Sequence, residues 1–286
     1  MENIVIRKLE TSADYHQAEA LQHAVWGGPD RLDVIPLHVL VTVQKYGGLV
    51  LGAFTPDGSM VAYLLGFLGW HPDGSGQLKH CSHQLGVLPE HRGRGLGRRM
   101  KLAQRDEIMK QGLDLITWTY DPLEGPNARL NIARLGATCS TYLREPYGEM
   151  DDALNKGVPA DRFEVTWWLA SDRVVRRLAA SGARCHTLPP LALANAPRAS
   201  ATGSLSPGEW HVPDAARFLV AVPPDFQAIK RAERDLAIAW REQTRDLFEA
   251  AFAAGYEVRD FHSVVTDGER RNVYLLEKQE VIENED

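Results

Sequence analysis

The 286-residue sequence lacks the features that mark membrane and secreted proteins. No apolar run approaches the ~20 residues that a membrane-spanning helix requires, and the N-terminal residues do not show the charged-then-apolar pattern of a secretion signal. Only three cysteines are present, Cys81, Cys139 and Cys185, and their wide spacing fits neither a disulfide framework nor a CxxC metal site. We therefore expect a cytoplasmic protein with no membrane partner.

The sequence also lacks an excess of positive charge. It holds 32 Lys and Arg residues against 38 Asp and Glu residues, which gives a formal net charge of -6 at pH 7. Because proteins that bind nucleic acids usually present a basic surface, no nucleic-acid partner is expected. The hydrophobic content of 44% and charged content of 24% are typical of a soluble globular protein with a substantial core.

The first 170 residues alternate between strand-like and helix-like patterns, and we expect them to form one domain. Thr11 and Ser12 are good helix N-caps that follow an alternating, strand-like run. The run TPDGS predicts a turn, because proline pre-sets φ and glycine supplies a positive φ. The predicted elements are strand 3–10, helices 14–26 and 36–46, strands 48–54, 60–68 and 80–88, helix 96–111, strand 113–120, a short helix 127–135 ended by Gly136, and strand 162–169.

Residues 171–286 have a different texture and carry no motif that we can interpret. The segment 187–213 is rich in proline, alanine and serine, which predicts a long loop or lid. A strand at 217–223, a helical stretch at 225–254 and a closing strand pair around TDGER predict a smaller C-terminal α/β unit. It could close over a site, stabilise the first domain or form a dimer surface, so a homodimer is left open.

A glycine-rich stretch stands between a strand-like run and a basic helix. Residues 92–97 read RGRGLG. A Walker loop would need a Lys followed by Ser or Thr, and a dinucleotide-binding fingerprint would need its third glycine one position later. The pattern that fits is Arg/Gln-x-x-Gly-x-Gly/Ala. There the unpaired amides at the start of a helix bind a pyrophosphate, glycines allow close approach, and arginines add charge. The alternative is an ordinary strand-to-helix turn.

Residues 3–169 resemble the GNAT superfamily of acyl-CoA-dependent N-acyltransferases. The resemblance is carried by LGVLPEHRGRGLGRRM, residues 85–100, which is close to the family signature V-x-P-x-x-R-G-x-G-I/L-G, and by the order of the predicted elements. It implies an α/β (α+β) fold with a mixed β-sheet flanked by helices. The sheet would be splayed open between the strand ending at Leu88 and the strand ending at Tyr120.

The resemblance also implies a cofactor site, with acetyl-CoA or another acyl-CoA in the split of the sheet. Its pantetheine arm would pair with the strand edge around Leu85–Val87, and its pyrophosphate would lie on the amides of Arg92–Gly97. The residues expected to bind the cofactor are Leu85, Val87, Arg92, Gly93, Arg94, Gly95, Leu96, Gly97, Arg98 and Asn127.

The reaction implied is direct attack of an amine on the thioester in a ternary complex. By analogy with the family, the backbone amide of Val87 would stabilise the oxyanion. His83, two residues before Leu85, is chemically suited to act as the base, although a strand histidine with a structural role is the alternative. The position where the family usually has a tyrosine acid is Ile132 here. Tyr142, Tyr147 and Tyr120 are the candidates nearby in sequence, and no acid at all is another option.

The segment TYDPLEGPNARLN offers further candidates. Asp121 and Glu124 follow a strand that borders the implied cleft, and they could hold a substrate ammonium or act as base. The plainer interpretation is a polar loop in which Asn127 is a helix N-cap. A metal site is not expected, because strand alternation places His80 and His83 on opposite faces.

The sequence therefore predicts an acyl-CoA-dependent N-acyltransferase. The acyl group would be acetyl or larger, such as succinyl, and the acceptor a small-molecule amine, such as an amino acid. The candidate catalytic groups are His83, Tyr142, Asp121 and the Val87 amide. The missing tyrosine leaves a second hypothesis, a CoA-binding regulatory or interaction protein that has lost turnover.

Overall fold

The computed structural model describes residues 3–26, 34–71, 73–148, 157–180, 188–195, 197–199, 205–266 and 269–279. Contacts divide the chain into two compact units. The first consists of Met1–Trp118, Asp151–Ala153 and Trp167–Ser171, and the second of Thr119–Met150, Leu154–Thr166 and Asp172–Asp286. The expected boundary at residue 170 stays a prediction. Cys185 and the acidic tail 280–286 lie outside the described residues.

The first unit holds a mixed sheet in the order β1-β2-β3-β4-β5. Strands β1 to β4 pair antiparallel, and β5 runs parallel to β4. The mixed α/β fold expected from the sequence is confirmed, and so is the element order of this part. The elements are β1 (Val5–Lys8), α1 (Ser12–Trp26), α2 (Leu37–Lys45), β2 (Leu49–Phe54), β3 (Met60–Trp70), β4 (Leu78–Val87), the short helix η1 (Pro89–His91), α3 (Leu96–Lys110) and β5 (Leu115–Tyr120).

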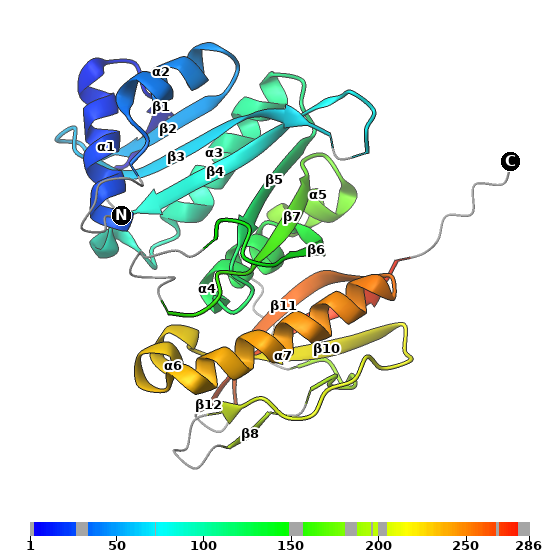
Figure 1. The fold of residues 1–286 in the computed structure, drawn as a ribbon. Helices are drawn as coiled ribbons and strands as arrows, with labels where there is room; N and C mark the ends of the chain where they lie inside the picture. The colour runs from blue at the N-terminus through cyan, green and yellow to red at the C-terminus, as the bar shows by residue number, and fades with distance from the viewer. Residues whose placement is uncertain are drawn as a thin grey trace, which may run out of the picture. The chain divides into compact units, whose positions relative to one another are not determined.

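Helices cover both faces of this sheet. Helices α1 and α2 lie on one face and α3 on the other (Figure 1). Thr11 caps α1 as expected, because its Oγ1 accepts a hydrogen bond from the backbone N–H of Asp14 at 3.2 Å. The core beneath α1 and α2 is built from buried side chains that include Leu21, Leu40 and Tyr63. No described helix is long and apolar enough to cross a membrane.

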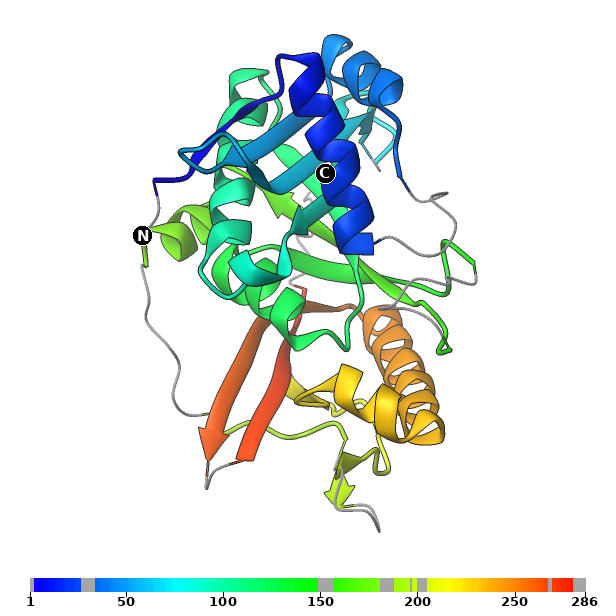
Figure 2. The same cartoon turned by 90° about the vertical axis from the view of Figure 1, so that its left-hand side faces the viewer.

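The second unit has its own strands, in the order β7-β6-β11-β12-β10, and the long helix α7 packs against β6 and β11 (Figure 2). The chain passes between the units within β5 and within β7. The elements are α4 (Gly125–Ala128), the π-helical turn η2 (Arg129–Arg134), β6 (Thr138–Leu143), β7 (Arg162–Trp168), α5 (Asp172–Ala179), β8 (Arg198–Ala199), β9 (Leu205–Ser206), β10 (Arg217–Val222), α6 (Phe226–Ala232), α7 (Arg234–Ala253), β11 (Tyr256–Thr266) and β12 (Glu269–Lys278).

The structure differs from the sequence prediction in three elements. The helical stretch 225–254 is two helices, because Glu233 adopts a non-helical conformation with φ -145° and ψ 79°. Strand β6 was not predicted, and it is recruited by pairing with β7 and β11. The short helix begins at Gly125 with Glu124 as its N-cap, so the prediction of Asn127 as N-cap was wrong. The described part of 187–213 has only the two-residue strands β8 and β9 and isolated bridges.

Candidate functional site

Strand β4 is paired on both sides only in its first half. The register with β5 consists of two pairs, His80 with Ile116 and Cys81 with Thr117. Pairing with β3 continues to the last residue of β4, where Ala62 lies opposite Val87. Among the described residues, the second half of β4 therefore has a strand partner on one edge alone. Such an edge leaves backbone donors and acceptors to be satisfied by other groups.

A bulge at His83 coincides with the point where β4 and β5 part. The register with β3 slips there, because Gly66 lies opposite Ser82 while Leu65 lies opposite Gln84. A bulge bends its strand and redirects the side chains that follow. Before it, Ser82 faces α3; after it, a Cβ on Gly86 would lie 2.9 Å from the Trp26 ring of α1. The bulge thus reverses which face of the sheet the even-numbered residues of β4 occupy: Ser82 faces α3, whereas Gly86 faces α1.

The free edge of β4 presents the backbone of Leu85 and Val87. The N–H of Leu88 donates to the carbonyl of Val61 at 3.1 Å, which makes Val61 and Leu88 a hydrogen-bonded pair. Hydrogen-bonded and non-hydrogen-bonded pairs alternate in antiparallel ladders. The N–H and C=O groups of Leu85 and Val87 therefore point away from β3, in the arrangement that an extended ligand arm requires for β-type pairing.

The glycine-rich loop between η1 and α3 is open. Gly93 and Gly95 have φ of 74° and 81°, a left-handed conformation that favours glycine, and a Cβ on either would meet no atom within 4 Å. Gly95 is the N-cap of α3, whose first amides have no intrahelical acceptors. This open cradle at a helix start fits a diphosphate. Arg92 is exposed, and its Nε donates to the Val87 carbonyl at 2.9 Å.

The other residues of the predicted cofactor site divide by exposure. Arg94 is exposed and Arg98 half-buried at the start of α3, whereas the Leu96 side chain is in the core with 3% of its surface exposed. Leu96 and Gly97 can thus serve a ligand through their backbone amides. Asn127 is an exposed residue within α4, in the second unit. Cofactor binding by these residues stays a prediction.

A buried basic cluster that sequence reasoning missed lies between β4 and α3. Lys101 is 2% exposed, and its Nζ donates to Ser82 Oγ at 2.8 Å and to Gln104 Oε1 at 3.2 Å. Burial lowers the pKa of Lys101 well below its ordinary value. His80 is fully buried on the same face, neither of its ring nitrogens has a hydrogen-bond partner in the described part of the chain, and burial lowers its pKa to about 3. Helical spacing alone does not separate a buried lysine from an exposed one.

His83 occupies the bulge. Its ring lies 5.7 Å from the Phe67 ring, centroid to centroid, and it receives no hydrogen bond from the described residues. The side chain is more than a third exposed, and burial of the rest lowers its pKa. Its role as a base stays a prediction. Among the described residues no group of three His, Cys, Asp or Glu side chains could hold a metal ion.

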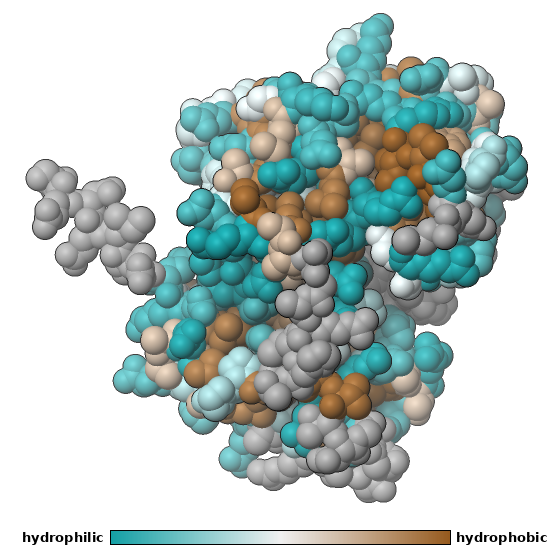
Figure 3. Space-filling view, turned by 180° about the vertical axis from the view of Figure 1, so that it is seen from behind, coloured by the Kyte–Doolittle hydropathy of each residue, from teal (hydrophilic) through white to brown (hydrophobic). Residues whose placement is uncertain are grey.

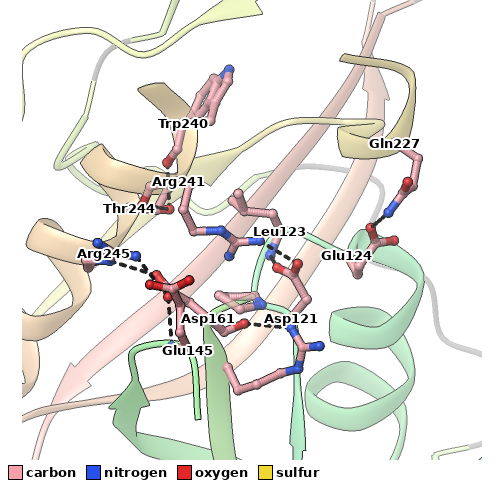
Figure 4. Close-up of polar contacts among 12 residues, drawn as sticks. Asp121, Leu123, Glu124, Glu145, Asp161, Gln227, Trp240, Arg241, Thr244 and Arg245 are labelled. Carbon is pink, nitrogen blue, oxygen red and sulfur yellow. Dashed lines mark hydrogen bonds and ion pairs between the residues drawn. The ribbon is translucent and has the colours of Figure 1, made fainter. Parts of the chain in front are cut away.

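In the second unit, Asp121 directly follows β5 and forms a buried ion pair (Figure 4). Its Oδ2 accepts a hydrogen bond from Arg241 Nη2 at 2.5 Å, and its Oδ1 accepts one from the Leu123 N–H at 2.8 Å. The Arg241 side chain, from α7, is 1% exposed, and its Nε and Nη1 have no hydrogen-bond partner among the residues that the structure describes. Both carboxylate oxygens of Asp121 are thus engaged by the protein.

Glu124 lies three residues further, with a different environment. Its Oε1 accepts a hydrogen bond from Gln227 Nε2 of α6 at 2.6 Å (Figure 4). Burial and the negative charge of Asp121 raise the pKa of Glu124, against the opposing effects of Gln227, Lys230 and Arg241.

Tyr142 belongs to another buried network of the second unit. Its hydroxyl donates to Asp161 Oδ2 at 2.8 Å, and Arg245 of α7 donates to both oxygens of Asp161. Burial raises the pKa of Tyr142. Its ring packs on those of Phe163 and Phe248. The Tyr142 hydroxyl is engaged by Asp161. A role for Tyr142 as the thiolate acid stays a prediction, and a structural role in this network is the alternative. Ile132, which occupies the position where the resemblance led us to look for a tyrosine, is fully buried.

No protein-family model matches the sequence, and no curated protein matches it. Solved structures are similar over part of the chain. The ribosomal-protein-S18-alanine N-acetyltransferase from Escherichia coli is 18% identical, with a TM-score of 0.45, and the match covers 59% of this chain and 95% of that one. The yncA protein from Salmonella typhimurium, solved with its cofactor acetyl-CoA, is 21% identical (TM-score 0.46, 59% and 95% covered). A GNAT-family acetyltransferase from Streptococcus pneumoniae is 12% identical (0.46, 57% and 98%).

Proposed function

We propose that the protein is an acyl-CoA-dependent N-acyltransferase that acts on a small-molecule amine. The observation that carries this proposal is the combination, within the first unit, of two features. The edge of β4 presents the N–H and C=O of Leu85 and the N–H of Val87, while the Val87 C=O accepts a hydrogen bond from Arg92. The glycine cradle that opens α3 begins five residues after Val87. An extended arm ending in a diphosphate matches both features.

The residues of this chain would hold coenzyme A mainly through the backbone. The amides of Gly95–Gly97 would meet the diphosphate, with Arg94 adding positive charge from the exposed side of the loop. Leu85 and Val87 would pair with the pantetheine arm. When bound, acyl-CoA supplies an acyl group activated as a thioester. The Val87 N–H is the donor that would face the acyl oxygen, where a positioned amide stabilises developing negative charge.

The direct test is to follow free thiol while the protein is incubated with acetyl-CoA or succinyl-CoA and a panel of amines that includes amino acids. We expect thiol release to depend on both the acyl-CoA and one class of amine. Tight CoA binding by calorimetry without amine-dependent thiol release would instead support a CoA-binding regulatory protein. No CoA binding at all would contradict both functions.

The exposed surface bears on a separate question, whether the protein associates with itself or with other partners. The exposed apolar residues of the first unit include Phe67, Trp70, Leu78 and Trp168, and the face seen from behind shows hydrophobic patches among polar residues (Figure 3). We propose no membrane or nucleic-acid partner, and a homodimer stays a prediction for sedimentation analysis.

A further inference from the structure

The point where the first unit's sheet splits is occupied by a side chain of α3. The parallel register of β4 and β5 ends at Cys81 and Thr117, so the next step would bring Ser82 opposite Trp118. Lys101 contacts both residues of that missing step. Its Nζ donates to Ser82 Oγ at 2.8 Å and lies 3.6 Å from the centroid of the Trp118 ring. One buried amine thus touches the last part of each strand before they separate.

The two residues that Lys101 contacts are held in place by further packing. Ser82 Oγ donates to Gln104 Oε1 at 3.2 Å, and Lys101 Nζ donates to the same oxygen at 3.2 Å. The Trp118 ring packs edge-on against the fully buried Trp167, with the centroids 5.9 Å apart. N–H groups favour the electron-rich face of an aromatic ring. All of these residues belong to the first unit.

The amine at position 101 does not serve the stability of the fold. Lys101 is 2% exposed, and its hydrogen-bond partners Ser82 and Gln104 are uncharged. Burial lowers the pKa of Lys101 well below its ordinary value, and a buried amine without a negative partner costs stability. A methionine has a similar length, and Ser82 and Gln104 would still bond each other beside it. The presence of an amine therefore points to a role other than stability.

The bond to Ser82 controls the strand edge that follows. Ser82 directly precedes the bulge of β4, and beyond the bulge Leu85 and Val87 direct their N–H groups away from β3. Because a bulge redirects its strand, the position of Ser82 decides where those N–H groups lie. Lys101 follows Gly95, the N-cap of α3, by six residues, which is about 9 Å along a helix axis. One helix thus carries both the glycine cradle and the anchor of the β4 edge.

We propose that Lys101 is a positioning residue for the acyl-CoA site of the first unit. Its contacts with Ser82 and Trp118 fix the point at which β4 leaves β5. They thereby set the line along which Leu85 and Val87 meet the pantetheine arm, relative to the diphosphate cradle on the same helix. This role rests on the proposed function and deepens it. Lys101 is buried and acts through Ser82, so it takes no part in the chemistry.

The first arm of the test is calorimetry of CoA binding. Lys101→Met should weaken CoA binding about tenfold, the size expected for the loss of one orienting hydrogen bond. Its unfolding free energy at pH 7 should be no lower than that of wild type, so a loss of folded protein does not explain the weaker binding. Lys110→Met, at an exposed position at the end of the same helix, is the control and should bind CoA like wild type. Equal CoA affinity in Lys101→Met and wild type would overturn the inference.

The second arm asks whether the effect passes through Ser82. Ser82→Ala alone would leave the buried Lys101 short of an acceptor, so it is made in the Lys101→Met background. If Lys101 acts through Ser82, the double variant should bind CoA no more weakly than Lys101→Met, because the bond has already been lost. A further loss of about tenfold in the double variant would mean that the two residues act independently, against the role assigned to Lys101.

The third arm needs no ligand. In ¹H–¹⁵N NMR spectra of the free protein, the amide signals of Leu85 and Val87 should shift in Lys101→Met and stay in place in Lys110→Met. Unshifted signals in Lys101→Met would overturn the inference, even if the affinity for CoA fell. A wild type that binds no CoA overturns the proposed function and with it the ligand named here, whereas the NMR comparison still decides whether Lys101 fixes the β4 edge.

Discussion

Lys101 Nζ lies 3.6 Å from the centroid of the Trp118 ring and donates a hydrogen bond to Ser82 Oγ at 2.8 Å. Lys101 comes from α3, Trp118 from β5, and Ser82 flanks the bulge of β4. A polar cluster is thus buried where β4 and β5 stop pairing. Because burial lowers the pKa of Lys101, this cluster links the stability of the first unit to pH.

The first prediction concerns that linkage. The unfolded chain binds a proton at Lys101 below pH 10.5, whereas the folded chain resists it until a lower pH. The contribution of Lys101 to stability is therefore fully present above pH 10.5, where the residue is neutral in both states, and is lost as pH falls toward the folded-state pKa. The free energy of unfolding thus rises with pH in that window. Lys101→Met should flatten the increase in unfolding free energy between pH 7 and 9.5, measured by urea denaturation. Lys45→Met, at an exposed site, is the control, and equal slopes in both variants would contradict the prediction.

The second prediction concerns His80. Its folded-state pKa of about 3 lies below the ordinary 6.5, mainly because of burial and secondarily because of Lys101. Its contribution to stability is therefore present above pH 6.5 and is lost as pH falls through the window down to 3. On going from pH 7 to 4.5, His80→Leu should lose about 2–3 kcal/mol less stability than wild type. His38→Leu is the control variant. If His80→Leu and wild type lost the same unfolding free energy between pH 7 and 4.5, His80 would not resist protonation in the folded state.

The third prediction concerns the glycine cradle. Gly95→Glu places a carboxylate at the open start of α3, and it should abolish CoA binding through steric block and charge repulsion. Gly58 has a similar φ of 87° and equally open surroundings, in the turn between β2 and β3. Gly58→Glu therefore carries the same backbone strain, about 1–2 kcal/mol, and should keep CoA affinity. Calorimetry distinguishes them; unchanged affinity in Gly95→Glu would mean that the loop is only a turn.

The fourth prediction concerns the Val87 amide. Val87→Pro removes the N–H that points away from β3, so it breaks no hydrogen bond of the β3 ladder. If this amide stabilises the acyl oxygen, kcat should fall by about 10²- to 10³-fold. Val87→Ala, which keeps the N–H, should retain most of the rate. Equal rates in the two variants, with both folded by circular dichroism, would remove Val87 from the catalytic groups.

The fifth prediction tests Tyr142, whose hydroxyl donates to the fully buried Asp161. If the role is structural, Tyr142→Phe should lower the unfolding free energy by about 1–2 kcal/mol and leave kcat unchanged. Asp161→Asn should cost about 3 kcal/mol or more, because it removes the buried negative charge that pairs with Arg245. Loss of kcat in Tyr142→Phe without loss of stability would restore Tyr142 as the acid.

Much of the fold could be predicted because its signals are local. Thr11 caps α1, Gly136 ends the short helical segment with φ of 80°, and the alternating runs form strands. The bulge at His83 could not be predicted, since the register of a strand depends on its neighbours. Nor could the break at Glu233 be predicted, because no glycine or proline marks it in the sequence; the two helices that it separates, α6 and α7, contact each other in the fold.

The candidate site shows the same division. The glycine pattern at residues 92–97 is contiguous, so its open cradle follows from left-handed glycines at the start of a helix. The partners of Asp121 and Glu124 are 120 and 103 residues away along the chain, and no spacing rule connects them.

By itself the sequence determined the glycine loop, the strand that leads to it and the acidic loop after β5, because each depends on residues that are neighbours along the chain. Only the tertiary structure decided which charges meet. Arg241 and Gln227 reach the acidic loop because α6 and α7 pack beside it, and burial, a property of the folded molecule alone, sets the proton affinities of Lys101, His80 and Glu124.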